Sequence, residues 1–297
     1  MSDSTRGLLF ALTAYGIWGS FAIFFSLVKH IPPLEVLTHR ILWCAALVMI
    51  IICVTRQWSK TLQVFKEPRI LVSLLISSVM IAANWGIYIW AVGNHHTVDA
   101  SFGYFMNPLL AVLLGVLFLK ENLAAYQKLA IALALCGVAY KVLAVGEIPW
   151  IALIIAVTFS IYGLIRKQTP VDTVTGLMIE TLLVLPLALG YFIWLEVNQA
   201  SNLTFNSNGS LLVASGIITA IPLLAFSAAA RKLSLSTLGF MNYIAPSLQL
   251  ISAVILLGEP FTFDEQVTFG FIWLGLLLFT GGALWRQRKA LAPAQAG

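Results

Sequence analysis

The sequence predicts an all-α integral membrane protein with ten transmembrane helices arranged as two inverted five-helix repeats. Three observations support this prediction: the composition, the spacing of the apolar segments and a match between the two halves of the chain. Hydrophobic residues make up 60% of the 297 residues and charged residues only 10%, against roughly 45–50% and about 25% in globular proteins. With 17 basic and 12 acidic residues, the chain is too poor in charge to hydrate the surface of a soluble fold.

A helix that crosses about 30 Å of hydrocarbon needs about 20 apolar residues, and the first half of the chain holds five such segments. In chain order they are Gly7–Val28, Leu34–Val54, Ile70–Val92, Ala100–Leu119 and Ala124–Val145. Pro68 and Gly146 mark breaks between segments, because proline and glycine favour turns. The fifth segment contains Lys128 and Lys141, whose charged ends we expect to snorkel to the interfaces. We assign residues 1–145 to the first repeat.

The second half of the chain holds five more apolar segments of suitable length. In chain order they are Pro149–Ile165, Val174–Leu195, Leu211–Ala230, Leu235–Leu257 and Phe263–Trp285. Pro170, the polar stretch Asn198–Gly209 and Pro260 separate them. We assign residues 146–297 to the second repeat, and no remaining stretch is long enough for a separate soluble domain.

Basic residues near the ends of these segments fall mainly on one side of the membrane. Of the 17 basic residues, only Lys29 and Lys141 lie near helix ends on the opposite side, and Arg40 lies within a helix. Cytoplasmic loops of membrane proteins carry the excess of Lys and Arg. The distribution therefore predicts that both termini are cytoplasmic, and its regular alternation supports the count of ten helices.

The two halves of the chain match at a constant offset of 138 residues. The matched pairs include Phe102 and Phe240, Pro108 and Pro246, Glu121 and Glu259, and Gly137 and Gly275. Because each repeat has an odd number of helices, the second has to enter the membrane from the opposite side. Inverted repeats are typical of secondary transporters, which bind substrate near the middle of the membrane between the two halves. We therefore expect a carrier that works by alternating access.

Three features of the sequence resemble a known family. They are the tract Asn84–Ala91 (NWGIYIWA), the tract Ala100–Pro108 (ASFGYFMNP) and the helix ends at Glu121 and Glu259. Together with the five-plus-five arrangement they resemble the EamA family of the drug/metabolite transporter superfamily, and the tract His39–Trp43 resembles its RarD-like branch. The resemblance implies an exporter or permease in the bacterial inner (plasma) membrane. Its substrate would be a small metabolite or drug-like molecule.

Two charged residues fall inside expected helices. The uncharged segments Ile41–Val54 and Thr181–Leu195 are too short to cross the bilayer at 1.5 Å per residue, so each helix has to draw in Arg40 or Glu180. Charges within a span almost always face the bundle interior or a wet cavity. The functional interpretation is that Arg40 fixes an anionic group, while Glu180 carries a coupling proton or binds an amine. The alternative is that each side chain snorkels to an interface.

Polar and aromatic side chains within the helices supply further candidates for a substrate cavity. They are Trp43, Asn84, Tyr88, Tyr104, Asn107, Asn242 and Gln249. The repeat register sets Asn242 opposite Tyr104. The alternative role for the amides is a hydrogen bond to a neighbouring helix. Pro108 and Pro246 are expected in mid-helix, where they free backbone carbonyls.

Other chemistries find no support in the sequence. It contains no GxxxxGK[ST] phosphate loop, HExxH zinc motif or GxSxG nucleophile elbow, so we expect no enzyme activity. The cysteines lack metal-ligand spacing, and Asp99, near His95 and His96, is expected to be an N-cap. We predict no metal, no cofactor and no nucleic-acid partner. The expected partners are a small-molecule substrate, the lipid bilayer and protons as a coupling ion, and oligomeric state is left open. A channel or a non-transporting membrane component is the alternative, ahead of an intramembrane enzyme.

Overall fold

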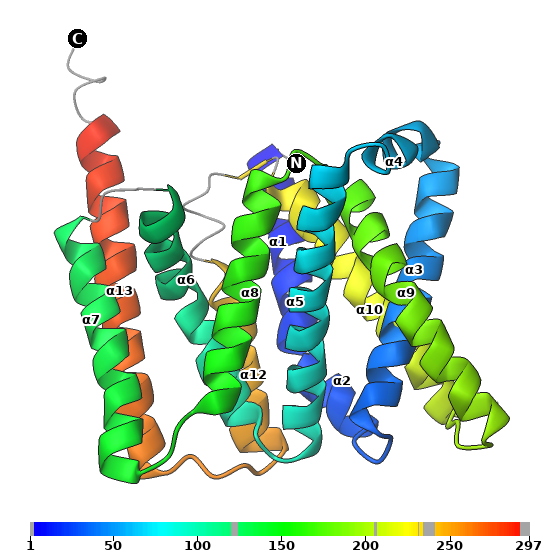
Figure 1. Cartoon of the computed structure of the whole chain (residues 1–297). Coiled ribbons are helices and arrows are strands. Elements are labelled where there is room, and N and C mark those ends of the chain that lie inside the picture. The colour runs from blue at the N-terminus through cyan, green and yellow to red at the C-terminus, as the bar shows by residue number, and fades with distance from the viewer. Residues whose placement is uncertain (1–2, 120–123, 205–206, 231, 234–240, 292–297) are drawn as a thin grey trace.

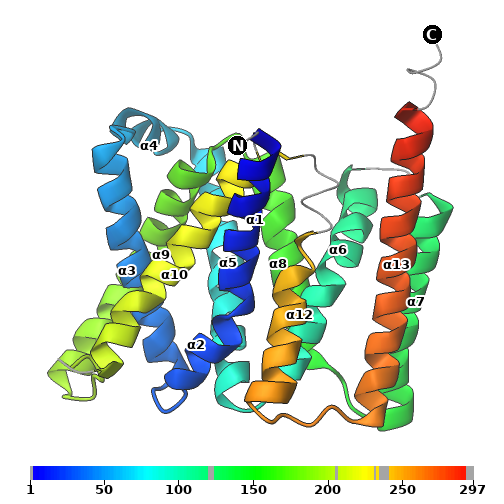
Figure 2. The ribbon, with the colours of Figure 1, turned by 180° about the vertical axis from the view of Figure 1, so that it is seen from behind.

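The computed structural model is a bundle of helices that run along a common direction (Figures 1 and 2). It describes residues 3–119, 124–204, 207–230, 232–233 and 241–291. All regular secondary structure within these ranges is helical, which confirms the all-α prediction. The first helix begins and the last helix ends at the same end of the bundle (Figure 1). We call this the terminal end and the opposite one the distal end.

The helices follow one another with short connections. The first half of the chain forms α1 (Asp3–Gly19), α2 (Phe21–Leu27), α3 (Pro33–Val54), α4 (Trp58–Val64), α5 (Pro68–Gly93), α6 (Thr97–Leu119), α7 (Ala125–Tyr140) and the π-helical turn η1 (Lys141–Val145). The second half forms α8 (Trp150–Gln168), α9 (Thr173–Val197), α10 (Ser207–Ala230), α12 (Ile244–Ile251), the π-helical turn η2 (Ser252–Leu256) and α13 (Phe263–Leu291). Every expected apolar segment is thus helical over most of the residues that the structure describes in it.

Seven of the described helices are long and apolar enough to cross a membrane. They are Thr5–Leu27, Pro33–Val54, Pro68–Gly93, Ala125–Leu143, Trp150–Gln168, Thr173–Val197 and Ser207–Phe226. The other three expected segments correspond to α6, to α12 with η2 and to α13, and the ninth lies partly outside the described residues. A multi-pass membrane fold is therefore confirmed, and the total of ten spans in two repeats stays a prediction.

Two expected helices differ from their prediction. The first is not continuous but breaks at Ser20, beside the point where Gly19 lets α12 approach closely: a Cβ atom at Gly19 would lie 2.6 Å from the Leu248 side chain. The ninth contains α12, which starts just before Pro246, so the expectation of a mid-helix proline is wrong there. In the first turn a proline is tolerated because its missing N–H would have no helical partner. Pro108 does lie inside α6, as expected.

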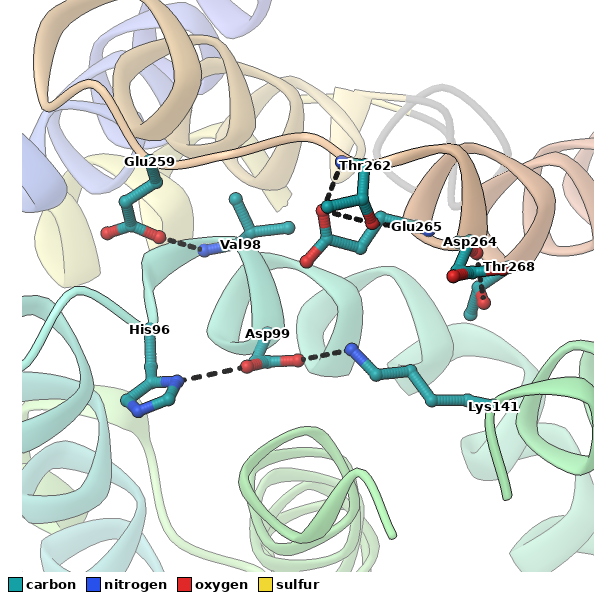
Figure 3. Close-up of polar contacts among 9 residues, drawn as sticks. All are labelled: His96, Val98, Asp99, Lys141, Glu259, Thr262, Asp264, Glu265 and Thr268. Atoms are coloured by element: carbon teal, nitrogen blue, oxygen red, sulfur yellow. Dashed lines mark hydrogen bonds and ion pairs between the residues drawn. The ribbon is translucent and has the colours of Figure 1, made fainter. Parts of the chain in front are cut away.

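The start of α6 is capped by a residue distant in sequence. The carboxylate of Glu259, only 4% exposed, accepts hydrogen bonds from the backbone N–H groups of Thr97 and Val98, both at 2.9 Å. Figure 3 shows this carboxylate reaching α6 from the segment before α13. The first N–H groups of a helix have no partner within the helix, and they favour negative charge. Glu259 therefore ties the α12–α13 connection to α6 at the distal end.

The expectation that Asp99 is an N-cap is wrong. Asp99 lies in the first turn of α6, and its carboxylate contacts Lys141 Nζ at 3.0 Å and His96 Nδ1 at 3.2 Å (Figure 3). Lys141, whose charged end we expect to snorkel to the interface, pairs with Asp99 at the distal end of the bundle. At the start of α13, Thr262 and Glu265 form a reciprocal capping box, with the Glu265 carboxylate 2.6 Å from the Thr262 backbone nitrogen. The distal end is thus dense in polar contacts.

Helices α7 and α13 form an antiparallel pair at one side of the bundle (Figures 1 and 2). Glycines bring their backbones together: a Cβ atom at Gly137 would lie 3.1 Å from the carbonyl oxygen of Thr268, and one at Gly275 would lie 2.9 Å from that of Ala130. The two contacts are reciprocal. The 138-residue offset that relates Gly137 to Gly275 also relates Ala130 to Thr268. We call this contact the glycine seam.

Substitution of Gly275 by leucine should lower the thermal stability of the purified protein, because the side chain would meet the backbone of α7. Overpacking of this kind typically costs about 1–3 kcal/mol. The matched control is Gly270→Leu on the same helix, where a Cβ atom meets nothing within 4 Å. Melting temperatures measured in detergent should fall for the first variant and not for the second, and an equal effect of both would contradict the close approach.

Candidate functional site

The guanidinium of Arg40 lies inside the bundle, where aromatic rings surround it. Arg40 is 2% exposed, and its Cζ atom lies 4.2 Å from the ring centroid of Trp85, 5.0 Å from that of Phe21 and 5.4 Å from that of Phe25. Its Nε atom donates a hydrogen bond of 2.8 Å to the hydroxyl of Thr219. Helices α2, α3, α5 and α10 therefore build this environment together. Cation–π contacts of a desolvated guanidinium are favourable by about 2 kcal/mol or more.

Three buried hydrogen-bond donors, on α3 and α5, find no partner among the described residues. Nη1 of Arg40, the Tyr88 hydroxyl and Nε1 of Trp43 are all buried without a hydrogen bond. Tyr88 packs on the same two rings that Arg40 covers, with centroid distances of 6.5 Å to Phe21 and 6.1 Å to Phe25. Trp43 lies one turn after Arg40 on α3. Buried polar groups without partners are uncommon in proteins, so these three donors are candidates for contact with a bound ligand.

Asn84 joins three helices and is fully occupied by them. Its amide nitrogen donates to the carbonyl oxygen of Ile155 at 3.0 Å and to the Thr158 hydroxyl at 3.1 Å. Its amide oxygen accepts a hydrogen bond of 2.9 Å from the Tyr104 hydroxyl. Tyr104 in turn packs at a tilt against Tyr88, with ring centroids 5.6 Å apart. Asn84 on α5 therefore fixes Tyr104 on α6 beside the unpartnered hydroxyl, and its own amide is used for helix–helix contacts.

The remaining polar candidates lie on α6 and around α12. Asn107 is buried, and its amide oxygen has no partner. The Gln249 amide nitrogen donates to the carbonyl oxygen of Trp18 at 2.9 Å, close to the break between α1 and α2, and its amide oxygen is unpartnered. Asn242 lies in a partly exposed turn before α12. Asn107 and Gln249 are thus buried in the bundle, whereas Asn242 is not.

Glu180 lies in a second polar cluster, formed by α5, α8 and α9. It is 2% exposed, and its carboxylate accepts hydrogen bonds from the Ser77 hydroxyl at 2.5 Å and the Tyr162 hydroxyl at 3.5 Å. Nε of Arg166 lies 3.6 Å from the same carboxylate and forms an ion pair with it. The guanidinium of Arg166 reaches across Gly176, where a Cβ atom would collide with it. Glu180 is therefore neutralised within the protein, whereas Arg40 has no ion-pair partner among the described residues.

A small space of about 10 Å³ lies beside Glu180. Its lining includes Ser78, Ile81, Trp85 and Thr181. A space of this size has room for about one water molecule. Trp85 therefore lines this space together with Glu180, and its ring also lies against the guanidinium of Arg40.

The sequence did not identify several residues that complete these clusters. They are Ser77, Trp85, Tyr162, Arg166 and Thr219. Arg166 was counted only as a basic residue at a helix end. The short connection between α8 and α9 was the available signal, because it holds the end of α8 near the start of α9 and so brings Arg166 within reach of Glu180. For Thr219 no comparable local signal exists, since it meets Arg40 from a distant part of the chain.

Comparison with known proteins shows extensive similarity. Residues 5–142 match the model of the EamA-like transporter family. Protein RarD of Escherichia coli (strain K12) is 43% identical over 97% of this chain and 98% of its own. An uncharacterized transporter of Vibrio cholerae is also 43% identical, over 94% of this chain and 93% of its own. The chloramphenicol-sensitive protein RarD of Pseudomonas aeruginosa is 32% identical over 94% of both chains. One crystal structure, 20% identical, shares the fold with a TM-score of 0.60 over 93% of this chain and 98% of its own.

The hydrogen bond between Asn84 and Tyr104 should appear as an energetic coupling. Asn84→Ala should destabilise the protein by about 1–3 kcal/mol, because it leaves buried groups on α6 and α8 without partners. Tyr104→Phe should then add little to the loss in the double variant, since the two residues share one bond. Tyr191→Phe on α9 serves as the matched control and should add independently to Asn84→Ala. Additive losses for the Asn84 and Tyr104 variants in thermal or denaturant unfolding would contradict this coupling.

Proposed function

The chain belongs to the EamA/RarD-like family of multi-pass inner-membrane transporters, and from this premise we propose that it is a secondary carrier working by alternating access. The observation that carries the proposal is the pair of buried polar clusters inside an apolar bundle. One cluster neutralises its own charge, and in the other the described residues supply the buried cation with no ion-pair partner. A passive membrane scaffold gains nothing from burying such charges, which cost several kcal/mol each unless they are compensated.

The substrate site in this proposal is the Arg40 cluster. Its wall would consist of side chains from α3, α5 and α6 together with the amide of Gln249 on α12. We assign it Arg40, Trp43, Asn84, Tyr88, Tyr104, Asn107 and Gln249. In this assignment Asn84 positions Tyr104 rather than contacting substrate through a free amide. Asn242 is assigned to the entrance, because it lies in a turn and is partly exposed.

The coupling residue in this proposal is Glu180. A proton that binds its carboxylate would remove the charge that holds Arg166, so the ion pair would weaken and the guanidinium could turn towards the terminal end. Arg166 lies in the last turn of α8, which leaves only a short distance to that end. The hydroxyls of Ser77 and Tyr162 would hold the carboxylate in place during the exchange. Loss and recovery of the ion pair between Arg166 and Glu180 would thus change the position of α8 relative to α9.

The glycine seam supports the assignment of two inverted repeats, residues 1–145 and 146–297. Reciprocal contacts are the signature of an interface with two-fold symmetry, in which residue i meets j and j meets i. Two units related in this way give two conformations of nearly mirror-related shape, one open to each side, as alternating access requires.

The terminal end should face the cytoplasm. Single cysteines introduced at Lys60, in α4 at the terminal end, and at Glu147, in the connection before α8 at the distal end, should report opposite sides. The background for both is a variant in which the native cysteines are replaced by alanine. A membrane-impermeant maleimide added to intact spheroplasts should label only the position at Glu147, and labelling of Lys60→Cys alone would reverse the orientation.

Glu180→Gln should abolish transport driven by a proton gradient and leave substrate exchange intact, because glutamine nearly keeps the shape and retains one acceptor oxygen but cannot release a proton. The transported compound is first identified by comparing the metabolites of cells with and without the protein. The control is Glu147→Gln at an exposed position, studied at matched membrane abundance. Gradient-driven uptake by Glu180→Gln at the wild-type rate would remove this residue from the coupling mechanism.

Counterflow in liposomes tests the carrier itself. Preloading unlabelled substrate should accelerate uptake of labelled substrate, because a carrier returns faster when occupied. A channel would show no such acceleration, and that result would overturn the proposal.

A further inference from the structure

We infer that the Arg40 cluster binds the carboxylate of an organic monoanion with a flat apolar body, a substrate class that rests on the proposed carrier function. The guanidinium is oriented for this role. Thr219 holds its Nε edge, three aromatic rings cover it, and Nη1 is left buried without a partner. Arginine presents a planar fork of donors that matches the two oxygens of a carboxylate.

The other unpartnered groups at this site fit the same ligand. The Tyr88 hydroxyl and Nε1 of Trp43 are hydrogen-bond donors towards an anion. A carboxylate can accept about four hydrogen bonds, so it has capacity for both of these groups and for Arg40. A ligand group that is only a hydrogen-bond donor could not bond to the guanidinium, because a guanidinium has no acceptor atom.

The charge balance selects a monoanion. Within the described chain no carboxylate lies within ion-pair distance of Arg40, and Glu180 is occupied by Arg166, Ser77 and Tyr162. One bound carboxylate would neutralise the single buried cation. A dianion would leave a net charge in the bundle, and a zwitterion would bring an ammonium group without a free carboxylate to receive it. Burial of an uncompensated charge costs several kcal/mol, so both are disfavoured.

The rings around the site define the rest of the ligand. Phe21, Phe25 and Trp85 place apolar surface around the charged group, and Tyr88 and Tyr104 extend it towards α6. Such walls favour a flat hydrocarbon or aromatic body next to the carboxylate. A small hydrophilic anion such as inorganic phosphate would leave these surfaces without contacts.

Thermal stabilisation of the purified protein tests the inference with four probes of similar size or charge: phenylacetate, phenylacetamide, phenylethylamine and inorganic phosphate. Only phenylacetate should raise the melting temperature of the wild type at millimolar concentration. Arg40→Gln should weaken its apparent affinity by about tenfold or more, because a hydrogen bond to a charged group is worth about 1.5–3 kcal/mol. The matched control Arg56→Gln, at an exposed position after the other end of α3, should bind like the wild type.

Thr219→Val provides a second variant that keeps the buried charge. It should weaken phenylacetate binding several-fold, because the guanidinium loses the acceptor that orients it. Stabilisation of the wild type by the amide or amine as strongly as by the acid, unchanged acid binding in both Arg40→Gln and Thr219→Val, or no stabilisation by phenylacetate would each overturn the inference. Counterflow of labelled phenylacetate separates the two proposals: binding through Arg40 without counterflow would refute the carrier and leave the carboxylate site.

Discussion

A guanidinium to which the described residues offer no carboxylate lies inside this bundle, and side chains from four helices pack around it. Helix α3 carries Arg40, α10 supplies the hydroxyl that fixes Nε, and α2 and α5 supply the rings that surround it. In water such an arrangement would gain little, because solvent would hydrate the charge. In an apolar bundle the same contacts decide where the helices lie. Gly216 on α10 reflects this constraint, since only a residue without a side chain lets α10 come close to the backbone of α3 at Trp43.

The two buried charges have different partners. Arg40 and Glu180 have opposite signs, yet each has its own surroundings, and Trp85 borders both. If the two charges were paired directly, each would satisfy the other and neither would need a ligand or a proton. The separate partner Arg166 leaves Arg40 available. In the proposed carrier, this division would assign substrate binding to Arg40 and coupling to Glu180, and Trp85 is the residue that their surroundings share.

Local patterns in the sequence predicted the helices and the burial of the charges, and long-range contacts account for the errors. Apolar segment length placed Arg40 and Glu180 inside helices, where both are 2% exposed. The same reasoning made Asp99 an N-cap, because nothing nearby indicated that Glu259 would reach the start of α6 from another helix pair. The position of a residue along a helix predicts its depth in the membrane. It does not predict which distant residue will form hydrogen bonds with its polar group. The Arg40 cluster depends on such long-range contacts, and the hydrogen bond from Arg40 to Thr219 is the clearest case.

The glycine seam also has a mechanical consequence. Where α7 and α13 meet at Gly137 and Gly275, backbone lies against backbone with no layer of side chains between them. Rotamer changes and repacking, which let most helix interfaces yield under load, have no atoms to act on there. The pair should therefore bend and slide less than other pairs in the bundle and behave as a strut. A displacement imposed on one end of a strut is delivered to its other end with little loss, across the full thickness of the membrane.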